Sequence, residues 1–332
     1  MACGLANVGQ TCYLNTLLQC LKACPEFRAS IVSSSAGAGA VANGICELFA
    51  AMDGVDGGSI NPSKFIKTVA AAFTFLNIRS QNDIHEIYML LVSRLGEELK
   101  TEMPRELHTS KRPVLADVQL EQAFVQLTKK CDSAWRKAVS HEYSSLTDAL
   151  HGQVLAQIVC GNCKYIHHNY QPFSVWEVPL VADAKSTTMP TLETCFNSSM
   201  SAETIDDWKC SKCNATAPSK KTLRMWKLPR VLVICIKRFR QENGRLIKIN
   251  APVDVPLEAQ MFPMEMGPDN AGLCYRLRAA AVHSGDIHFG HYNAICAGPD
   301  AASWLAFNDA HIFRVVDVKE AVKDGYLLFY AL

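Results

Sequence analysis

The sequence predicts an α+β protein, with a helical first part up to about residue 145 and a β-rich remainder. In the first part, apolar residues recur every three or four positions, which is the spacing of one helix face. From Leu150 onward, apolar and β-branched runs alternate with turn residues, which is typical of strands joined by tight connections. The 332 residues, 49% of them hydrophobic, suffice to bury a sizeable core in one large domain or two.

The first predicted helix begins at Cys12, directly after Thr11, a residue type that often caps helix N-termini. Its apolar face comprises Leu14, Leu17, Leu18 and Leu21, and Pro25 ends the pattern. A thiol in the first turn of a helix lies near unpaired N–H groups and the positive end of the dipole, which favour the thiolate. Cys12 is therefore a candidate nucleophile, although most free cysteines are simply small buried residues.

Two glycines frame the segment before this helix. Gly4 and Gly9 permit tight turns that bring Asn7 beside the thiol. A side-chain amide in that position can donate a hydrogen bond to an oxyanion. The segment thus combines a nucleophile with a group that stabilises developing negative charge.

Four more helices are predicted before the β-rich part. They cover Ile45 to Met52, Asn61 to Leu76, Gln81 to Lys100 and Ala116 to Ser140. The last of them contains Trp135, which we expect to be a core anchor. In the helix after Gln81, Asp83 and Glu86 are three positions apart, so both carboxylates project to one side. They are either ordinary charges at a helix N-terminus or part of a binding site.

The β-rich part shows strand patterns and one short helix at Pro190 to Phe196. The predicted strands are Phe173 to Leu180, Val231 to Phe239, Arg245 to Ile249, Tyr275 to His283, His291 to Cys296 and Tyr326 to Tyr330. Asn243 and Gly244 favour a type I′ hairpin turn. The apolar run from Val231 reads as a strand of the core sheet.

Two C-x-x-C pairs stand in the β-rich part. They consist of Cys160 and Cys163, and of Cys210 and Cys213. Two such pairs supply the four thiolates of a tetrahedral structural zinc site, and four ordinary reduced thiols are the alternative. Because four cysteines fill the site, the neighbouring His167 and His168 are expected to be exposed.

The C-terminal region offers partners for Cys12. A lone histidine is more often structural than catalytic, but His291 follows Gly290 at the start of a predicted strand, where its ring can face a cleft. A general base is oriented by a third group on its other ring nitrogen. Asn308 and Asp309, after the aromatic residues Trp304 and Phe307, are the candidates. We favour Asn308 and leave Asp309 a supporting role.

Composition excludes several classes of protein. A net charge of +1 argues against a general nucleic-acid binder, which needs a basic excess. The apolar runs are too short for a membrane span, and the first residues do not show a basic region followed by an apolar stretch. Fourteen cysteines then point to reduced thiols, a metal site and a nucleophile instead of a disulfide framework. We expect a cytoplasmic or nuclear protein that does not bind membranes or nucleic acid.

The segment from Gly4 to Asn15 closely resembles the cysteine box of the ubiquitin-specific protease family of deubiquitinases. The matching residues are Gly4, Leu5, Asn7, Gly9, Thr11, Cys12, Tyr13 and Asn15. Gln10 departs from the family, which usually has Asn there, and is expected to alter local hydrogen bonds.

Four later segments also resemble family blocks. They are QNDIHEI from Gln81, KLPRVLVICIKRF up to Phe239, GHYNA from Gly290 and WLAFNDAHI up to Ile312. The resemblance therefore covers essentially the whole chain. In the family, the block like KLPRVLVICIKRF is core sheet, and the block like GHYNA carries the catalytic histidine. The block like WLAFNDAHI carries the Asn or Asp that orients this histidine.

The resemblance implies a papain-like fold in a single catalytic domain, residues 1–332. A helical thumb would extend to about residue 145. A β-sheet palm and fingers would follow from about 146 to 332, with the zinc-bearing fingers at about 155–225. One structural Zn²⁺ would be bound by the four cysteines, with no catalytic cofactor.

The resemblance also implies a reaction. Cys12, His291 and Asn308 or Asp309 would cleave the bond after the C-terminal glycine of ubiquitin through a thioester, with Asn7 at the oxyanion. The substrate-binding residues would be Gln81, Asp83, Glu86, Gly290 and Tyr292. The partner would be ubiquitin or ubiquitinated proteins, and the protein would be a monomer.

Three alternatives stay open. The chain could hold ubiquitin without cutting it, or hydrolyse another ubiquitin-like modifier whose tail also ends in Gly-Gly. A zinc-dependent nucleic-acid binder is the third, suggested by lysines around the second cysteine pair, which are Lys209, Lys212, Lys220 and Lys221. It leaves the Cys, His and Asn constellation unexplained.

Overall fold

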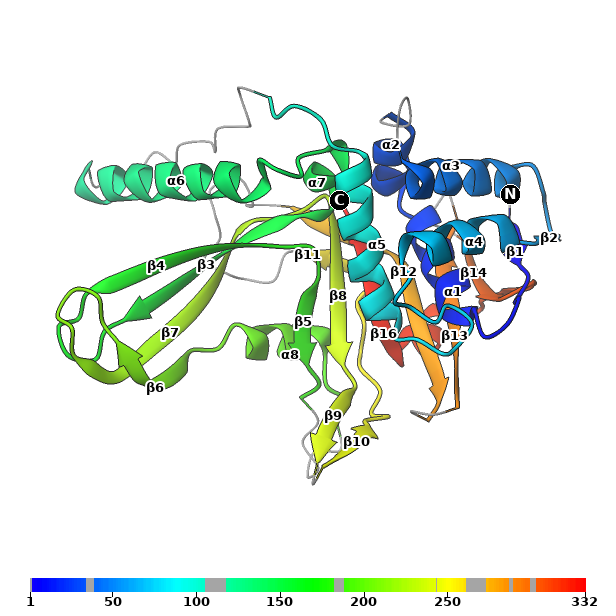
Figure 1. Ribbon diagram of the computed structural model, residues 1–332. Coiled ribbons are helices and arrows are strands. Elements are labelled where there is room, and N and C mark those ends of the chain that lie inside the picture. The colour runs from blue at the N-terminus through cyan, green and yellow to red at the C-terminus, as the bar shows by residue number, and fades with distance from the viewer. Residues whose placement is uncertain are drawn as a thin grey trace.

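The computed structural model describes residues 2–33, 39–104, 118–181, 188–242, 244–260, 273–286, 289–298 and 303–332. Helices dominate the first part and mostly antiparallel sheets the second. The predicted α+β class is thus confirmed. Figure 1 shows a four-stranded sheet extending away from the N-terminal helices, with the larger sheet between them.

The N-terminal helices gather around α1. They are α1 (Cys12–Lys22), α2 (Pro25–Ser33), α3 (Ala40–Asp53), α4 (Ser63–Ala72), α5 (Ile84–Glu98) and the short α7 (Ser145–Leu150). The short strands β1 (Gly4–Leu5) and β2 (Ser59–Ile60) pair in parallel beside them. All residues from Cys12 to Leu21 are buried, so α1 has no solvent face. We predicted one apolar face, and this was too narrow because helices cover one side of α1 and the large sheet covers the other.

The large sheet forms the centre of the molecule. Its strands, in spatial order, are β15 (His311–Arg314), β14 (Trp304–Asn308), β13 (Gly290–Ala297), β12 (Cys274–Gly285), β16 (Gly325–Ala331), β8 (Val231–Lys237) and β5 (Trp176–Pro179). Strand β11 (Glu258–Gln260) pairs with β12, and β9 (Phe239–Glu242) pairs with β10 (Arg245–Lys248). Helices α8 (Leu192–Ser199) and α9 (Val318–Val322) complete this part of the chain.

The sequence of strand β8 is apolar without alternation, and its position in the sheet explains why. Successive side chains of a strand point to opposite faces. Val231, Val233 and Cys235 pack in the core shared with the N-terminal helices. Leu232, Ile234 and Ile236 pack in a second core on the other face, together with residues of α8. The sheet is therefore buried on both faces, and the predicted core strand is confirmed.

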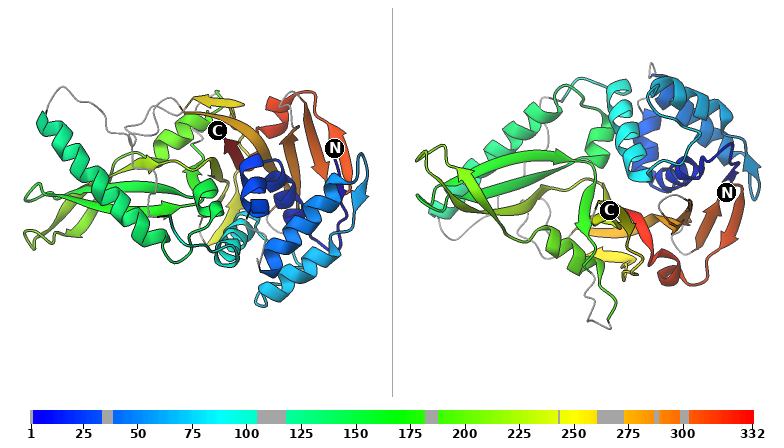
Figure 2. Two further views of the ribbon diagram at one scale, coloured as in Figure 1. Left: turned by 90° about the horizontal axis from the view of Figure 1, so that it is seen from above. Right: turned by 60° about the horizontal axis from the view of Figure 1, so that its bottom comes forward.

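The second sheet carries the cysteine pairs at one end. Its strand order is β4 (Ile166–Phe173), β3 (Gly152–Val159), β7 (Thr216–Lys227) and β6 (Glu203–Lys209). Helix α6 (Val118–Val139) lies along it, as both views of Figure 2 show. Trp135 is buried as predicted, but in a small cluster with Val139 and Tyr143 apart from the two main cores.

Most predicted elements are present, and three helices of the described residues, α2, α7 and α9, were missed. Pro25 ends the first pattern as predicted, yet it is also the first residue of α2, a position that suits proline because its missing N–H is not needed there. Helix α7 has only six residues and is defined by a capping box between Ser144 and Thr147. Of the predicted hairpin turn, Asn243 lies outside the described residues. In the part of the chain that the structure describes, no helix has the length and apolarity to cross a membrane.

The turn that precedes α1 and its N-cap Thr11 has an unusual backbone at Gln10. Gln10 is exposed and has a φ of 54°, in the left-handed region, and Gly9 before it has a φ of 112°. Asn enters this region more readily than Gln. The related family usually has Asn at this position, which the left-handed backbone explains.

Gln10→Asn is expected to raise the free energy of unfolding by about 0.5 kcal/mol, because Asn relieves part of the left-handed strain. Urea denaturation would measure the change. Gln126→Asn, at an exposed site within α6, is the matched control and should lower stability slightly, because Asn is the poorer helix former. Equal effects at the two sites would show that the backbone of Gln10 is unstrained.

Candidate active site

Cys12 lies at the start of α1 and lines a cavity of about 290 Å³ between the N-terminal helices and the large sheet. The other lining residues are Tyr13, Gln81, Asn82, Asp83, Glu86, Phe239, Leu246, His283, Gly290, Tyr292 and Tyr326. All five predicted substrate-binding residues are among them. The fold thus brings the cysteine box, the start of α5 and the strand that carries His291 to one place.

The Cys12 thiol is not activated in the way that we predicted. Burial raises its pKa above the ordinary value, and hydrogen bonding from the backbone N–H of Tyr292 offsets only part of this effect. The helix start therefore does not make a standing thiolate, because removal from water outweighs it. Among the described residues, no hydrogen bond joins Cys12 to His291.

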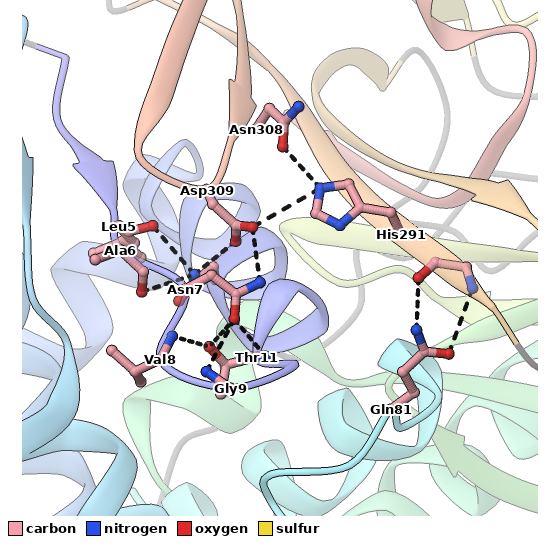
Figure 3. Close-up of polar contacts among 12 residues, drawn as sticks. Leu5, Ala6, Asn7, Val8, Gly9, Thr11, Gln81, His291, Asn308 and Asp309 are labelled. Atoms are coloured by element: carbon pink, nitrogen blue, oxygen red, sulfur yellow. Dashed lines mark hydrogen bonds and ion pairs between the residues drawn. The ribbon is translucent and has the colours of Figure 1, made fainter.

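His291 is at the start of β13, and Asn308 is at the end of β14 on the neighbouring strand. The Nε2 of His291 lies 2.8 Å from the Oδ1 of Asn308 and 3.9 Å from the Oδ2 of Asp309. Figure 3 shows both side chains approaching this one ring nitrogen. With Nε2 donating to Asn308, Nδ1 is left to accept a proton.

Asp309 makes stronger contacts elsewhere. Its Oδ2 accepts a hydrogen bond from the Nδ2 of Asn7 at 2.9 Å, and its Oδ1 accepts one from the Nδ2 of Asn15 at 2.8 Å. The residue occupies a turn between β14 and β15 with a φ of 51°, which Asp tolerates better than most residues. The carbonyl of Ala310 in this turn leaves no room for a Cβ at Gly4, which explains that glycine.

The amide of Asn7 is fixed from both ends. Its Oδ1 accepts hydrogen bonds from the backbone N–H groups of Gly9 and Thr11 and from the Thr11 hydroxyl. Its Nδ2 donates to Asp309 and has a second N–H in reserve. Thr11 precedes α1 as predicted, but its hydroxyl makes no capping bond to the helix because it is engaged with Asn7 and the N–H of Val8.

Gln81 links the two walls of the cavity. Its Nε2 donates to the carbonyl of Gly290 at 2.8 Å, and its Oε1 accepts from the N–H of Gly290 at 3.4 Å. The imidazole of His283 packs against Gly290 so closely that a Cβ there would collide with it. Figure 3 shows this bridge beside His291. The bridge ties the segment before α5 to the residue that precedes His291.

The two acidic residues of this wall differ in their bonding. Asp83 is the N-cap of α5, and its Oδ1 accepts from the N–H groups of His85 and Glu86. Its Oδ2 accepts from the hydroxyl of Tyr326 at 2.8 Å. Burial raises the pKa of Tyr326 far above its ordinary value, so this hydroxyl stays a donor. Asp83 is thus a structural cap as well as a cavity residue, and Glu86 remains exposed.

Sequence reasoning did not assign roles to several residues of the site. Asn15 was matched only as part of the cysteine box, although it also donates to the carbonyls of Leu5 and Ala6. Burial lowers the pKa of His283 to about 4, which keeps its ring neutral. Tyr326 gave no local signal, because its partner Asp83 is distant in sequence.

The four predicted cysteines converge at the end of the four-stranded sheet. Their sulfur atoms all lie within 4.8 Å of one another. Cys160 is 3.9 Å from Cys213 and Cys163 is 3.7 Å from Cys210. A tetrahedral ion bound at about 2.3 Å requires sulfur separations of about 3.8 Å. The cluster could therefore hold a metal ion.

The two cysteine pairs have the same backbone. Lys164 and Asn214, each directly after the second cysteine of a pair, have φ values of 61° and 57°. Each donates its N–H to the carbonyl of the pair's first cysteine, at 3.1 and 2.8 Å. The pKa of Cys213 is lowered to about 6, first by the backbone N–H of Ala215, which favours the thiolate that a metal requires.

The expectation that His167 and His168 are exposed is wrong. Both are half-buried and hydrogen-bonded. His168 Nε2 lies 3.1 Å from the Nε2 of Gln157, whereas His167 Nε2 lies 3.2 Å from the sulfur of Cys210. The contact between His167 and Cys210 depends on how the strands that carry the two cysteine pairs are arranged. The spacing of the cysteines in the sequence does not predict this arrangement.

A family model and several related proteins match this chain over nearly its whole length. A family model described as ubiquitin carboxyl-terminal hydrolase matches residues 3–330. Ubiquitin carboxyl-terminal hydrolase 21 of Bos taurus is 28% identical, with 99% of this chain and 61% of that protein covered. Ubiquitin carboxyl-terminal hydrolase 4 of Saccharomyces cerevisiae is 26% identical, with 99% and 39% covered. The chain thus spans about three fifths or less of these relatives.

Solved structures show the same fold. The SAGA Ubp8/Sgf11/Sus1/Sgf73 DUB module bound to ubiquitin aldehyde aligns with a TM-score of 0.73 at 21% identity, covering 99% of this chain and 69% of that one. A SAGA DUB module bound to monoubiquitin gives the same TM-score and identity, covering 99% and 68%. The predicted fold is confirmed by this likeness. The family model over residues 3–330 shows that this chain belongs to the ubiquitin carboxyl-terminal hydrolase family.

Proposed function

We propose that the chain is a cysteine-type deubiquitinase that cleaves the isopeptide or peptide bond after the C-terminal glycine of ubiquitin. The observation that carries this proposal is the cavity in which Cys12 meets Asp83 and Glu86 behind the bridge between Gln81 and Gly290. The two carboxylates suit the Arg-containing tail of ubiquitin. Gln81 and Gly290, joined by the bridge, line the same cavity as the thiol.

The raised pKa of Cys12 decides where the proton is before the reaction. The thiol is protonated in the free protein, so His291 acts as general base through Nδ1 while Asn308 holds Nε2. The sulfur attacks the carbonyl carbon of the terminal glycine and a C–S bond forms. The backbone N–H of Cys12 and the second N–H of Asn7 stabilise the oxyanion.

The rest of the cycle returns the proton. Imidazolium of His291 protonates the departing lysine amine as the C–N bond breaks and a thioester remains. His291 then takes a proton from water, which attacks the thioester. The free carboxyl end of ubiquitin leaves and the Cys12 thiol is restored.

The metal that we propose for the four-cysteine cluster is one structural Zn²⁺. Four thiolates at these separations fill a tetrahedral shell and leave no position for substrate, so the chemistry of the reaction needs no cofactor. Bound there, the ion would join the turns that follow β3 and β6. Its contribution is to hold the end of the four-stranded sheet.

Ubiquitin is the proposed partner, and complexes with ubiquitin of the structurally similar Ubp8 modules support it. Those modules contain several subunits, so the predicted monomer remains a proposal. The cytoplasmic or nuclear location is also a proposal. Hydrolysis of another ubiquitin-like modifier is the second candidate, because the tails of those modifiers also end in Gly-Gly.

Cys12→Ala is expected to lower cleavage of a linear ubiquitin fusion by at least about 10³-fold, because it removes the nucleophile. Cys274→Ala, which removes an exposed thiol, is the control and should retain activity. A ubiquitin probe with a C-terminal electrophile should label the wild type at Cys12 alone. Cleavage by Cys12→Ala at the wild-type rate would refute the assignment of Cys12 as the nucleophile. If a probe built on a related modifier labels Cys12 and the ubiquitin probe does not, the substrate is that modifier and not ubiquitin.

Asn308→Ala is expected to lower kcat/KM by about 10²-fold, because the imidazole of His291 loses its orientation. Asp309→Asn keeps a residue that tolerates the left-handed turn and should cost less. Steady-state kinetics on a ubiquitin C-terminal fluorogenic substrate would compare them. A larger loss at Asp309 would transfer the orienting role to that carboxylate.

Iodoacetamide should alkylate Cys12 of the free protein slowly near pH 7 and faster near pH 9. The sign follows from the raised pKa, since the reactive thiolate becomes abundant only as the pH approaches it. Peptide mass spectrometry would follow Cys12 separately from the other cysteines. A rate that is already maximal below pH 7 would indicate a standing thiolate–imidazolium pair instead.

A further inference from the structure

His167 is the one imidazole among the described residues that touches the cysteine cluster. It belongs to β4, which follows the first cysteine pair, whereas its partner Cys210 begins the second pair. The Nε2 of His167 lies 3.2 Å from the sulfur of Cys210. This distance is short for a contact between nitrogen and sulfur, so the contact is a hydrogen bond and not simple packing.

The ring of His167 is held in place by two aromatic residues. Its centroid is 4.8 Å from that of Tyr165 and 5.8 Å from that of Trp208, and both partners meet it edge to face. Opposite it on β3 stands Ile158. The next residue, His168, pairs instead with Gln157 and makes no contact with a cysteine in the described part of the chain. One histidine of the pair is thus directed at the cluster and the other is not.

The chemistry of the cluster calls for such a donor. Four thiolates around a divalent ion carry a net charge of −2, and N–H groups that donate to sulfur spread this charge. Cys210 already accepts the backbone N–H of Lys212 at 3.4 Å, and Cys213 accepts the amide of Asn162 at 3.7 Å. A side chain that orients or supports a ligand in this way tunes how firmly the metal is held.

Imidazole nitrogen is also a common ligand of zinc in its own right. The Nε2 of His167 approaches the same sulfur that Cys163 approaches to within 3.7 Å. If the sulfur of Cys210 is absent, the nitrogen is the nearest described atom of ligand type to the emptied position. Loss of that thiol therefore leaves three sulfurs and one nitrogen, a set that structural zinc sites also use.

We propose that His167 is a fifth member of the metal centre. It donates Nε2–H to the Cys210 thiolate while all four cysteines bind the ion, which slows release of the metal. When that thiolate is lost, the neutral ring carries its proton on Nδ1 and binds the ion as the fourth ligand through the Nε2 lone pair. This inference rests on the proposed zinc site. It predicts a site that tolerates loss of Cys210 better than loss of Cys213.

The donor role is tested by the rate at which purified protein loses zinc to a chromogenic chelator. His167→Phe keeps the ring stack but removes the nitrogen and should speed release by about 10-fold. His167→Gln restores an N–H donor, so its rate of zinc release should lie between those of wild type and His167→Phe. His168→Phe, one residue away, is the matched control and should leave the rate unchanged. Equal release rates for His167→Phe and His168→Phe would overturn the donor role.

The ligand role is tested with cobalt in place of zinc, because its absorption spectrum reports tetrahedral geometry and the number of thiolates. Wild type should show four thiolates, and Cys210→Ala should keep a tetrahedral site with three. Cys213→Ala and the double variant Cys210→Ala with His167→Phe should bind cobalt far more weakly. Equal cobalt spectra and affinities for Cys210→Ala with and without His167 would overturn the ligand role.

A separate outcome concerns the zinc site itself. Metal analysis of wild type should return about one zinc per chain, and its absence would overturn the zinc site and this inference with it. Labelling of Cys12 by the electrophilic ubiquitin probe checks that each variant is folded. Failure of the His167 proposal, which is measured by metal release and cobalt spectra, is therefore distinguishable from failure of the proposed deubiquitinase function, which is measured by labelling of Cys12.

Discussion

The complete burial of α1 is the constraint on which the rest of the structure depends. A helix with no solvent face must satisfy its polar side chains internally. Gln19 does so on the carbonyl of Cys3, and Asn15 on the carbonyls of Leu5 and Ala6 and on Asp309. All of these bonds are donated by the amide nitrogens, whereas the buried Oδ1 of Asn15 has no hydrogen-bond partner among the described residues. The donated bonds fix the N-terminal segment against the helix and bring the turn after β14 to the same place. The position of Asn7 then follows, because the same Asp309 carboxylate holds its amide.

Local patterns in the sequence predicted much of this site. The cysteine box placed Cys12 at a helix start, and the glycine before His291 placed that histidine at a strand start. Asn308 was preferred to Asp309, and it lies 2.8 Å from the ring nitrogen against 3.9 Å for Asp309. That preference rested on the resemblance of this segment to the family's last block, because the strand Trp304–Asn308 was not predicted.

What the sequence could not predict depends on contacts between distant segments. The thiol pKa rises because burial by the sheet outweighs the helix start, and burial is a property of the assembled fold. The contact of His167 with Cys210 requires the register of two strands that the spacing does not contain. Helix α7 was missed because six residues held by a cap show too little periodicity. The four cysteines converge as predicted, and zinc binding remains a prediction.

The strand order of the large sheet has a consequence for synthesis of the protein. Strand β16 lies between β8 and β12, although it is made after both. Until it inserts, each of those strands exposes an unpaired edge, and such edges invite association with other chains. It also carries the Tyr326 hydroxyl that binds the cap of α5. Because Tyr326 also lines the cavity, insertion of β16 completes the sheet and the cavity in one step.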